Sequence, residues 1–212
     1  MVRRRIAALS HRTPKKSWDL KPTLRTRGTC LKSKPLFIAT MASSQQVIRE
    51  VSPDVEGVLN REVRYFGDIP LPLEAYNPFR SQYNSTLILS SLRRTVVGKG
   101  VDYLMALTSV DLYSLTLNFV FGEAELNGKV AVVSYHRLDG KLLNQGGKQL
   151  FLDRLTKEIV HEFGHVAGLR HCRNPACVMA FSNHVLDTDR KSKMFCHNCL
   201  QAYERFLVVE EV

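Results

Sequence analysis

Apolar residues recur at helical spacing in two stretches of the chain. Between residues 80 and 94, apolar positions at Tyr83, Leu87, Leu89 and Leu92 fit one face of an amphipathic helix. From residue 148 to 169 a longer series forms a broad apolar face, made of Phe151, Leu152, Leu155, Ile159, Phe163, Val166 and Ala167. The pattern therefore predicts two long helices, and CLQAYERFLVVEE near the C-terminus predicts a third.

Four other stretches have the composition of strands. They are EVRYF (62–66), VDYLMALT (101–108), LNFVFGEAEL (117–126) and AVVSYHRL (131–138). NGK at 127–129 is a hairpin signal, so the last two strands are expected to pair. Residues 41–61 are polar and are expected to be irregular. This order of strands and helices predicts an α/β or α+β fold in which two helices back a sheet.

The size and composition favour one globular domain. The 212 residues can bury a substantial core, and 44% hydrophobic with 24% charged residues is ordinary for a globular protein. The longest apolar run, residues 35–42, is far too short to span a membrane. We expect a domain at 45–212, divided into an N-terminal subdomain (45–171) and a C-terminal subdomain (172–212).

The net charge of +10 is confined to the first part of the chain. Residues 1–40 contain 11 Lys and Arg but only one acid, Asp19, whereas residues 41–212 contain 19 of each sign. Such a basic segment, interrupted by prolines, cannot bury enough apolar surface to fold alone. Residues 1–44 are therefore predicted to be a basic, disordered tail, and the remaining chain is neutral.

The basic tail has three interpretations. It has the composition of an organelle transit peptide. It could instead be an arm that binds nucleic acid or an anionic surface, or it could precede the working start at Met41. The first and third are favoured over the arm. A secretory signal is disfavoured, because the apolar stretch is short and far from the N-terminus.

Four of the five cysteines lie close together. Cys30 is in the tail, and the others crowd into 28 residues: Cys172, Cys177, Cys196 and Cys199. A disulfide framework usually spreads its cysteines through a secreted chain, whereas paired short spacings are typical of metal ligands. Buried thiols or disulfides are the alternative. The spacing favours a metal site in a reducing compartment such as the cytoplasm.

The segment HEFGHVAGLRH (161–171) has the spacing of a catalytic zinc site. His161 and His165 share one helix face, and Glu162, about 100° round the axis, can reach a water without binding the ion. Gly168 can end the helix with a positive φ and return His171 as a third ligand. Three protein ligands leave one position for water. The alternative is a helix with surface histidines and a capping glycine.

This segment resembles the metzincin metalloproteases, and the longer match HEFGHVAGLRHCRNPACVM followed by FCHNC resembles the archaemetzincin family. LNFVFGEAE and SYHRL are also similar, so the likeness covers about residues 50–205. It implies a zinc-dependent peptidase with a mixed sheet backed by two long helices, and it implies that Met179 lies beneath the histidines. One departure is that 16 residues separate Met179 from Cys196, where the family has 17.

The adjacent residues His171 and Cys172 can serve different ions. Neighbouring side chains of an extended segment point to opposite sides. Cys172 would then join the three later cysteines in a closed, structural zinc site, giving two zinc ions per chain. This site would replace a hydrophobic core that residues 172–212 lack. The basic residues near it either offset its charge or are solvated: Arg170, Arg173, Lys191 and Lys193.

The favoured hypothesis is a peptidase in which Glu162 is the general base. Partly by resemblance, AVVSYHRL (131–138) is expected to be the edge strand along which a peptide lies. One alternative is a two-zinc module without activity, although a structural site needs no base. Another is nucleic-acid binding through the tail, which the neutral body disfavours. A monomer is assumed, and no role is expected for His136, His184 and His197.

Overall fold

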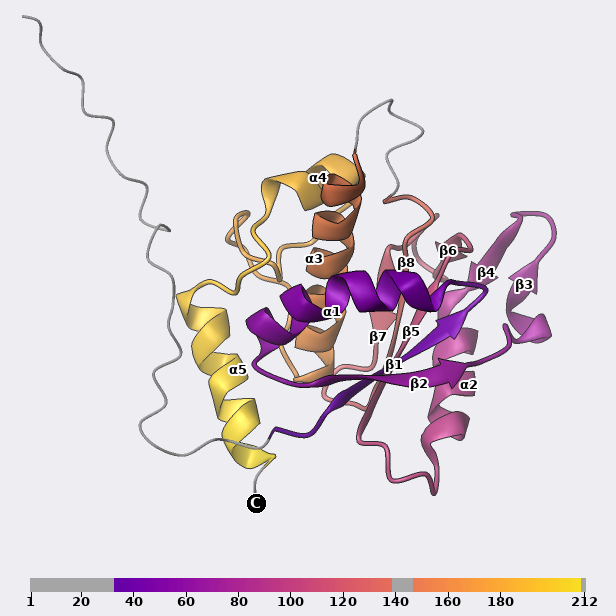
Figure 1. Ribbon diagram of the computed structural model, residues 1–212. Helices are drawn as coiled ribbons and strands as arrows, with labels where there is room; N and C mark the ends of the chain where they lie inside the picture. Colours follow the sequence, from indigo (N-terminus) through magenta and orange to yellow (C-terminus); the bar gives the residue numbers. More distant parts are fainter. Residues whose placement is uncertain (1–32, 139–146, 211–212) are drawn as a thin grey trace, which may run out of the picture. The chain divides into compact units, whose positions relative to one another are not determined.

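Five strands form the central sheet, in the order β2-β1-β5-β8-β7. The computed structural model describes residues 33–138 and 147–210 of the chain. The strands are β1 (Leu36–Met41), β2 (Val63–Asp68), β5 (Tyr103–Thr108), β7 (Gly122–Ala124) and β8 (Val130–Ser134). The first three and β8 run parallel, and β7 pairs antiparallel with β8. This gives a mixed sheet whose short edge strand is β7 (Figure 1).

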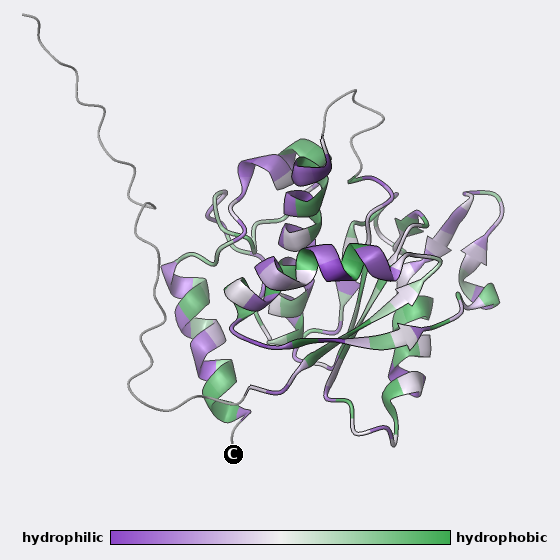
Figure 2. Cartoon of the chain, viewed as in Figure 1, coloured by the Kyte–Doolittle hydropathy of each residue, from purple (hydrophilic) through white to green (hydrophobic). Residues whose placement is uncertain are grey.

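Helices cover both faces of this sheet. The helices are α1 (Gln45–Leu59), α2 (Ser85–Val96), α3 (Lys148–Val166), α4 (Val185–Arg190) and α5 (His197–Val209). Alternate strand residues enter two cores: Met105 and Val133 pack with α1, α3 and α5, whereas Ala106 and Val132 pack with α2. Figure 2 shows the central strands mostly in the hydrophobic colour, while the helices carry both colours. The fold is the mixed, helix-backed sheet that the sequence predicts.

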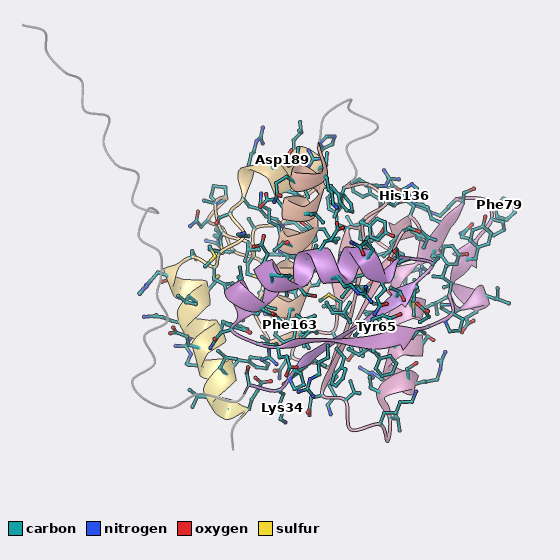
Figure 3. The ribbon with its side chains drawn as sticks, in the orientation of Figure 1. Lys34, Tyr65, Phe79, His136, Phe163 and Asp189 are labelled. Atoms are coloured by element: carbon teal, nitrogen blue, oxygen red, sulfur yellow. The ribbon has the colours of Figure 1, made fainter. Side chains whose placement is uncertain are left out.

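A small second sheet extends the molecule beside α2. It follows the 3₁₀ helix η1 (Leu73–Ala75) and consists of β3 (Tyr76–Asn77), β4 (Gln82–Asn84) and β6 (Leu112–Tyr113). Figure 3 places Phe79 at the outer end of the β3–β4 hairpin. The helix predicted from residue 80 begins only at Ser85, because Asn84 caps it by accepting a hydrogen bond from the amide of Leu87.

The expectation that residues 41–61 are irregular is wrong, because they contain α1. Ser44 caps this helix, and its buried residues follow helical spacing at Ile48, Val51, Val55, Val58 and Leu59. Pro53 lies inside the helix, where proline normally counts against helical structure. The apolar positions are few and separated by polar ones, but packing against α3 and the sheet outweighs local preference.

The tail boundary at residue 44 is also wrong, because β1 lies between β2 and β5 in the sheet. Leu36, Ile38 and Met41 are buried there. A short apolar run next to basic residues has no period that distinguishes it from a tail, and only pairing with two neighbours reveals it as a central strand. Residues 1–32, with Cys30 and the three interpretations of the tail, lie outside the described residues.

The hairpin predicted at NGK is confirmed, since β7 and β8 pair on either side of it. The strand expected at 117–126 is shorter, however, and regular pairing with β8 is limited to Gly122–Ala124. The expectation that 131–138 forms the edge strand is wrong. β8 lies between β5 and β7, so the edge belongs to β7. Hairpin spacing predicts the pairing of two strands but not which of them has a further neighbour.

The C-terminal segment packs into the main core, contrary to the expectation that it lacks hydrophobic mass. Val178, Phe195 and Tyr203 are buried in the same cluster as α1 and α3. The guanidinium of Arg61, almost fully buried, pairs with Glu210 after α5 at 2.6 Å. A division at 171/172 stays a prediction. Among the described residues, none of the helices has both the length and the hydropathy to cross a membrane.

Candidate active site

The last turns of α3 carry His161 and His165 side by side. The Nδ1 atom of His161 lies 2.8 Å from the carbonyl of Val178, and that of His165 lies 2.7 Å from the carbonyl of Leu169. A carbonyl can only accept, so each Nδ1 carries the proton and donates it. Each Nε2 is therefore left with a free lone pair, which is the form of histidine that binds metals.

These two lone pairs face each other across a metal-sized gap. The Nε2 atoms of His161 and His165 are 3.2 Å apart, and two acceptors at this distance repel unless a cation lies between them. Two nitrogens on a tetrahedral zinc, each about 2.05 Å from the metal, are about 3.3 Å apart. Burial, followed by the charge of Lys191, holds the pKa of His161 well below its usual range, and burial lowers that of His165 to about 4. The pair fits a zinc ion.

Gly168 ends α3 and directs His171 back toward this pair. Its φ of 86° lies in the left-handed region, and the amide of Leu169 then donates to the carbonyl of Gly164 at 2.9 Å. The rings of His165 and His171 lie 4.8 Å apart between their centres. One nitrogen from each of His161, His165 and His171 falls within 4.8 Å of the others. The three predicted histidines therefore form one donor group.

Glu162 is held against the edge strand. Its side chain is buried, and a Cβ added to Gly122 would lie 2.6 Å from Cγ of Glu162 and 2.7 Å from its Oε1. Only glycine at the start of β7 leaves room for this carboxylate. Burial, together with the charge of the Glu158 carboxylate, raises the pKa of Glu162 well above its usual range. Sequence reasoning missed Gly122, although an isolated glycine in a strand pattern often marks such a close approach.

A cleft of about 840 Å³ contains the histidines and Glu162. Its lining includes residues 114–124 and, from the segment before α4, Phe181, Ser182 and Asn183. The ring of Phe181 lies 4.9 Å from that of His171, centre to centre. The donor group therefore faces an open groove bordered by the edge of the sheet.

A buried ion pair joins α3 to the segment after α4. Nζ of Lys191 lies 2.9 Å from Oε1 of Glu158, and both side chains are almost completely buried. Thr188 donates a hydrogen bond to the same oxygen. Glu158 is one helical turn before Glu162, and it also lines the cleft. The sequence left open whether Lys191 balances the thiolates or is solvated. In the structure it is buried, and its partner is the carboxylate of Glu158.

The four C-terminal cysteines form a second donor group. One sulfur from each of Cys172, Cys177, Cys196 and Cys199 lies within 4.8 Å of the others. The sulfurs of Cys172 and Cys196 are 3.8 Å apart, and two thiolates on a tetrahedral zinc, each about 2.3 Å away, are about 3.8 Å apart. All four are free thiols, which excludes a disulfide among them in this structure.

The surroundings of the thiols suit a bound cation. Burial raises the pKa of Cys177 to about 11, and burial together with the charge of Cys177 raises that of Cys199 as well. Four thiolates at this distance therefore need a positive charge among them. Backbone amides of Asn174 and Cys196 point at the sulfurs of Cys172 and Cys177, and Cys196 is the N-cap of α5, where a helix favours negative charge.

Met179 and the remaining candidates occupy defined places. Met179 is fully buried, and a Cβ added to Gly164 on α3 would lie 2.3 Å from its sulfur. Within residues 33–138 and 147–210, none of the three other histidines belongs to a donor group: Nδ1 of His136 contacts the carbonyl of Ser109, His184 caps α4, and His197 is exposed at the start of α5. Lys193 pairs with Asp54, and Arg170 and Arg173 are exposed.

Known proteins resemble this chain in sequence and in fold. The sequence profile of Peptidase family M54 matches residues 40–205. The archaemetzincin of Archaeoglobus fulgidus is 40% identical over 164 residues, which cover 77% of this chain and 95% of that protein. The crystal structure of the archaemetzincin from Methanopyrus kandleri has a TM-score of 0.73 and 34% identity, covering 87% of this chain and 99% of that chain.

A third similarity concerns the metal. The crystal structure of a zinc-dependent peptidase from Methanocorpusculum labreanum has a TM-score of 0.71 and 31% identity, and it covers 79% of this chain and 99% of that chain. The family match extends over most of the described residues and includes both donor groups. On this evidence the chain belongs to peptidase family M54 and is a zinc metallopeptidase of the metzincin type.

Proposed function

We propose that the chain hydrolyses peptide bonds with a zinc ion held by His161, His165 and His171 and with Glu162 as general base. The observation that carries this proposal is the pair of free Nε2 lone pairs 3.2 Å apart, on the floor of the cleft that also contains Glu162. When bound, zinc supplies a Lewis acid that lowers the pKa of water and polarises a carbonyl. Gly168 supports the group by returning His171 to it.

Glu162 moves the proton in this mechanism. Its carboxylate takes a proton from the attacking water and passes it to the nitrogen of the departing amine. The position against Gly122 supports this role, because it keeps the carboxylate beside the edge strand where a substrate carbonyl would lie. Met179 serves as an apolar support beneath the histidines through its contact with Gly164.

The substrate backbone adds to β7. The amide of Ser134 donates to Phe121, and the amide of Glu125 donates to Val130, so odd-numbered residues of this segment bond to β8. Antiparallel ladders alternate, and the backbone groups of Gly122 and Ala124 therefore point to the open edge. A peptide in extended form can pair with both. The role of substrate-binding edge strand, which was expected for residues 131–138, is therefore assigned to β7.

The second donor group holds a structural zinc. Cys172, Cys177, Cys196 and Cys199 leave no position for water in a tetrahedral site, and the chain then binds two zinc ions. Four thiolates need a reducing compartment to stay free, which supports the cytoplasm or a similar location for the protein.

Replacement of the base separates this proposal from an inactive two-zinc module. Glu162→Gln should retain zinc at both sites but lose hydrolysis by at least 10³-fold, on the order expected when a proton-transfer group and its charge are removed together. Zinc content by mass spectrometry and cleavage of a mixed peptide library are measured together. Glu204→Gln, on α5 and outside the cleft, is the matched control. Equal cleavage by Glu162→Gln and the unaltered protein would refute the assignment.

A further inference from the structure

One wall of the cleft is built by residues 114–121, which we name the rim loop. The loop connects β6 to β7, and Val120 within it forms an antiparallel bridge with Leu112 of β6, so the open edge of β7 begins at Gly122. Leu115 and Leu117 belong to it and line the cleft, yet 87% of Leu115 and 38% of Leu117 is exposed. Exposed leucines are common singly, but these two border a groove that already contains the reactive groups.

Contacts from the second sheet hold the rim loop in place. Arg80 and Gln82 both donate to the carbonyl of Asn118, each at 3.0 Å. The guanidinium of Arg137 lies 4.4 Å from the ring centre of Phe119 and forms a two-point ion pair with Asp111. The part of the rim loop that follows Leu117 is therefore anchored at Asn118 and Phe119 and forms a preformed wall.

The three carboxylates of the cleft already have partners or an assigned role. Glu123 accepts hydrogen bonds from Ser85 and Thr86, and Glu158 is paired with Lys191. Glu162 is assigned to proton transfer. Carboxylates with such partners offer little attraction to a charged substrate side chain, so selection along this wall depends on apolar contact.

We propose that Leu115 and Leu117 select peptides with a large apolar side chain on the side of the scissile bond that lies beneath the rim loop. This inference rests on the proposed peptidase function and names its substrate class. A substrate strand paired with Gly122 lies in the cleft that the rim loop also lines, so its side chains beyond Gly122 pass Leu115 and Leu117. Burial of an apolar side chain there removes both surfaces from water.

The test measures binding and does not need turnover. The zinc-loaded full chain carrying Glu162→Gln is titrated with fluorescent hexapeptides that are identical except for Leu or Ser, placed at each position in turn, and anisotropy gives the affinity. At one or two positions Leu should bind about 10-fold more tightly than Ser, the discrimination typical of an apolar contact. In the same background, Leu115→Ser with Leu117→Ser should reduce this ratio to about 2-fold without changing zinc content.

Leu73→Ser is the matched control, because Leu73 on η1 is 88% exposed but does not line the cleft. It should leave the Leu-to-Ser ratio unchanged. The proposal is overturned if the ratio survives in the double variant, if no position prefers Leu, or if no peptide binds. A preference for Asp over Leu would point to Arg170, which also lines the cleft, and would equally overturn it.

The same peptides separate this proposal from the catalytic one. If the unaltered protein binds Leu peptides selectively but cleaves none, the catalytic assignment fails and the rim-loop assignment stands. If it cleaves Leu and Ser peptides at equal rates, with equal affinity, the rim-loop assignment fails and the catalytic one stands.

Discussion

Two glycines, one on β7 and one on α3, allow close contacts around α3 that a residue with a side chain at either position would prevent. At Gly122 the missing Cβ leaves space for Glu162, and at Gly164 it leaves space for the sulfur of Met179. Neither glycine has a positive φ, so backbone conformation does not require them. The two glycines are required instead by close packing beside the histidine group.

Gly122→Ala tests this requirement at the edge strand. The added methyl would displace the Glu162 carboxylate, so we expect kcat/KM to fall on the order of 10²-fold, as small misplacements of catalytic groups commonly cause. Zinc content should not change. Gly57→Ala on α1, where nothing lies within 4 Å of the added Cβ, is the control and should stabilise the helix by about 0.5–1 kcal/mol. An unchanged kcat/KM in Gly122→Ala would show that Glu162 does not depend on this contact.

At the scale of elements, α3 is joined to α4 and the residues after it by two ion pairs. Arg154 holds Asp189, labelled in Figure 3, through two hydrogen bonds of 2.7 Å. One turn further along α3, Glu158 holds Lys191, whose Nζ also lies 3.5 Å from the carbonyl of Ala180. Because Ala180 follows Met179, the second pair connects α3 to the turn that contains Met179.

Lys191→Met should strongly destabilise the fold, because it leaves the Glu158 carboxylate buried without a counter-charge. Loss of one partner of a buried pair typically costs about 3–5 kcal/mol, measured here by denaturant unfolding of the zinc-loaded protein. The double variant Lys191→Met with Glu158→Leu should recover most of this loss. Lys193→Met breaks the exposed pair with Asp54 and should cost no more than about 1 kcal/mol. Similar losses for the two lysines would contradict the argument.

Periodicity predicted α2 and α3, whose apolar stripes are long, and the hairpin signal predicted the pairing of β7 with β8. Periodicity did not predict β1, because six residues are too few to show a period, or α1, because a proline lies within the helix. The edge position of β7 depends on the order of all five strands. Local sequence does not contain that order, because long-range pairing decides it.

For the molecule as a whole, the two donor groups share short segments of backbone. His171 belongs to one group and its neighbour Cys172 to the other. Cys177 belongs to the second group, and the carbonyl of its neighbour Val178 accepts the Nδ1 proton of His161. Two neighbouring pairs thus connect the groups, and we expect order at the cysteine group to be transmitted to the histidines through them.

Cys172→Ser should therefore weaken zinc binding at both sites. We expect loss of the thiolate zinc and a drop in histidine-site affinity of about 10–100-fold, the range found when groups that orient a ligand are lost, measured by chelator competition. His171→Ala is the comparison: it should abolish peptide cleavage while the thiolate zinc and the fold persist. Undiminished histidine-site affinity in Cys172→Ser would disprove the coupling.

Much of the site follows from ligand spacing, because residues 161–172 encode a helix face, a glycine stop and a change of direction. The structure brings together the residues that this spacing singled out. Gly122 was not anticipated as part of the site, and Lys191 was considered only as a partner of the cysteines and not of Glu158, since each acts through a neighbour distant in sequence. Leu115 and Leu117 have no motif at all, and their role is visible only once the cleft is known.

The alternation of β7 also constrains how the length of this chain can vary. If one residue were inserted between Phe121 and Glu125, the outward-facing amides would turn inward, and a bulkier side chain would take the place of Gly122 against Glu162. An insertion before Asn118 would lengthen the rim loop but leave this alternation unchanged. Related chains should therefore vary in length before Asn118 and keep the same number of residues between Phe121 and Glu125.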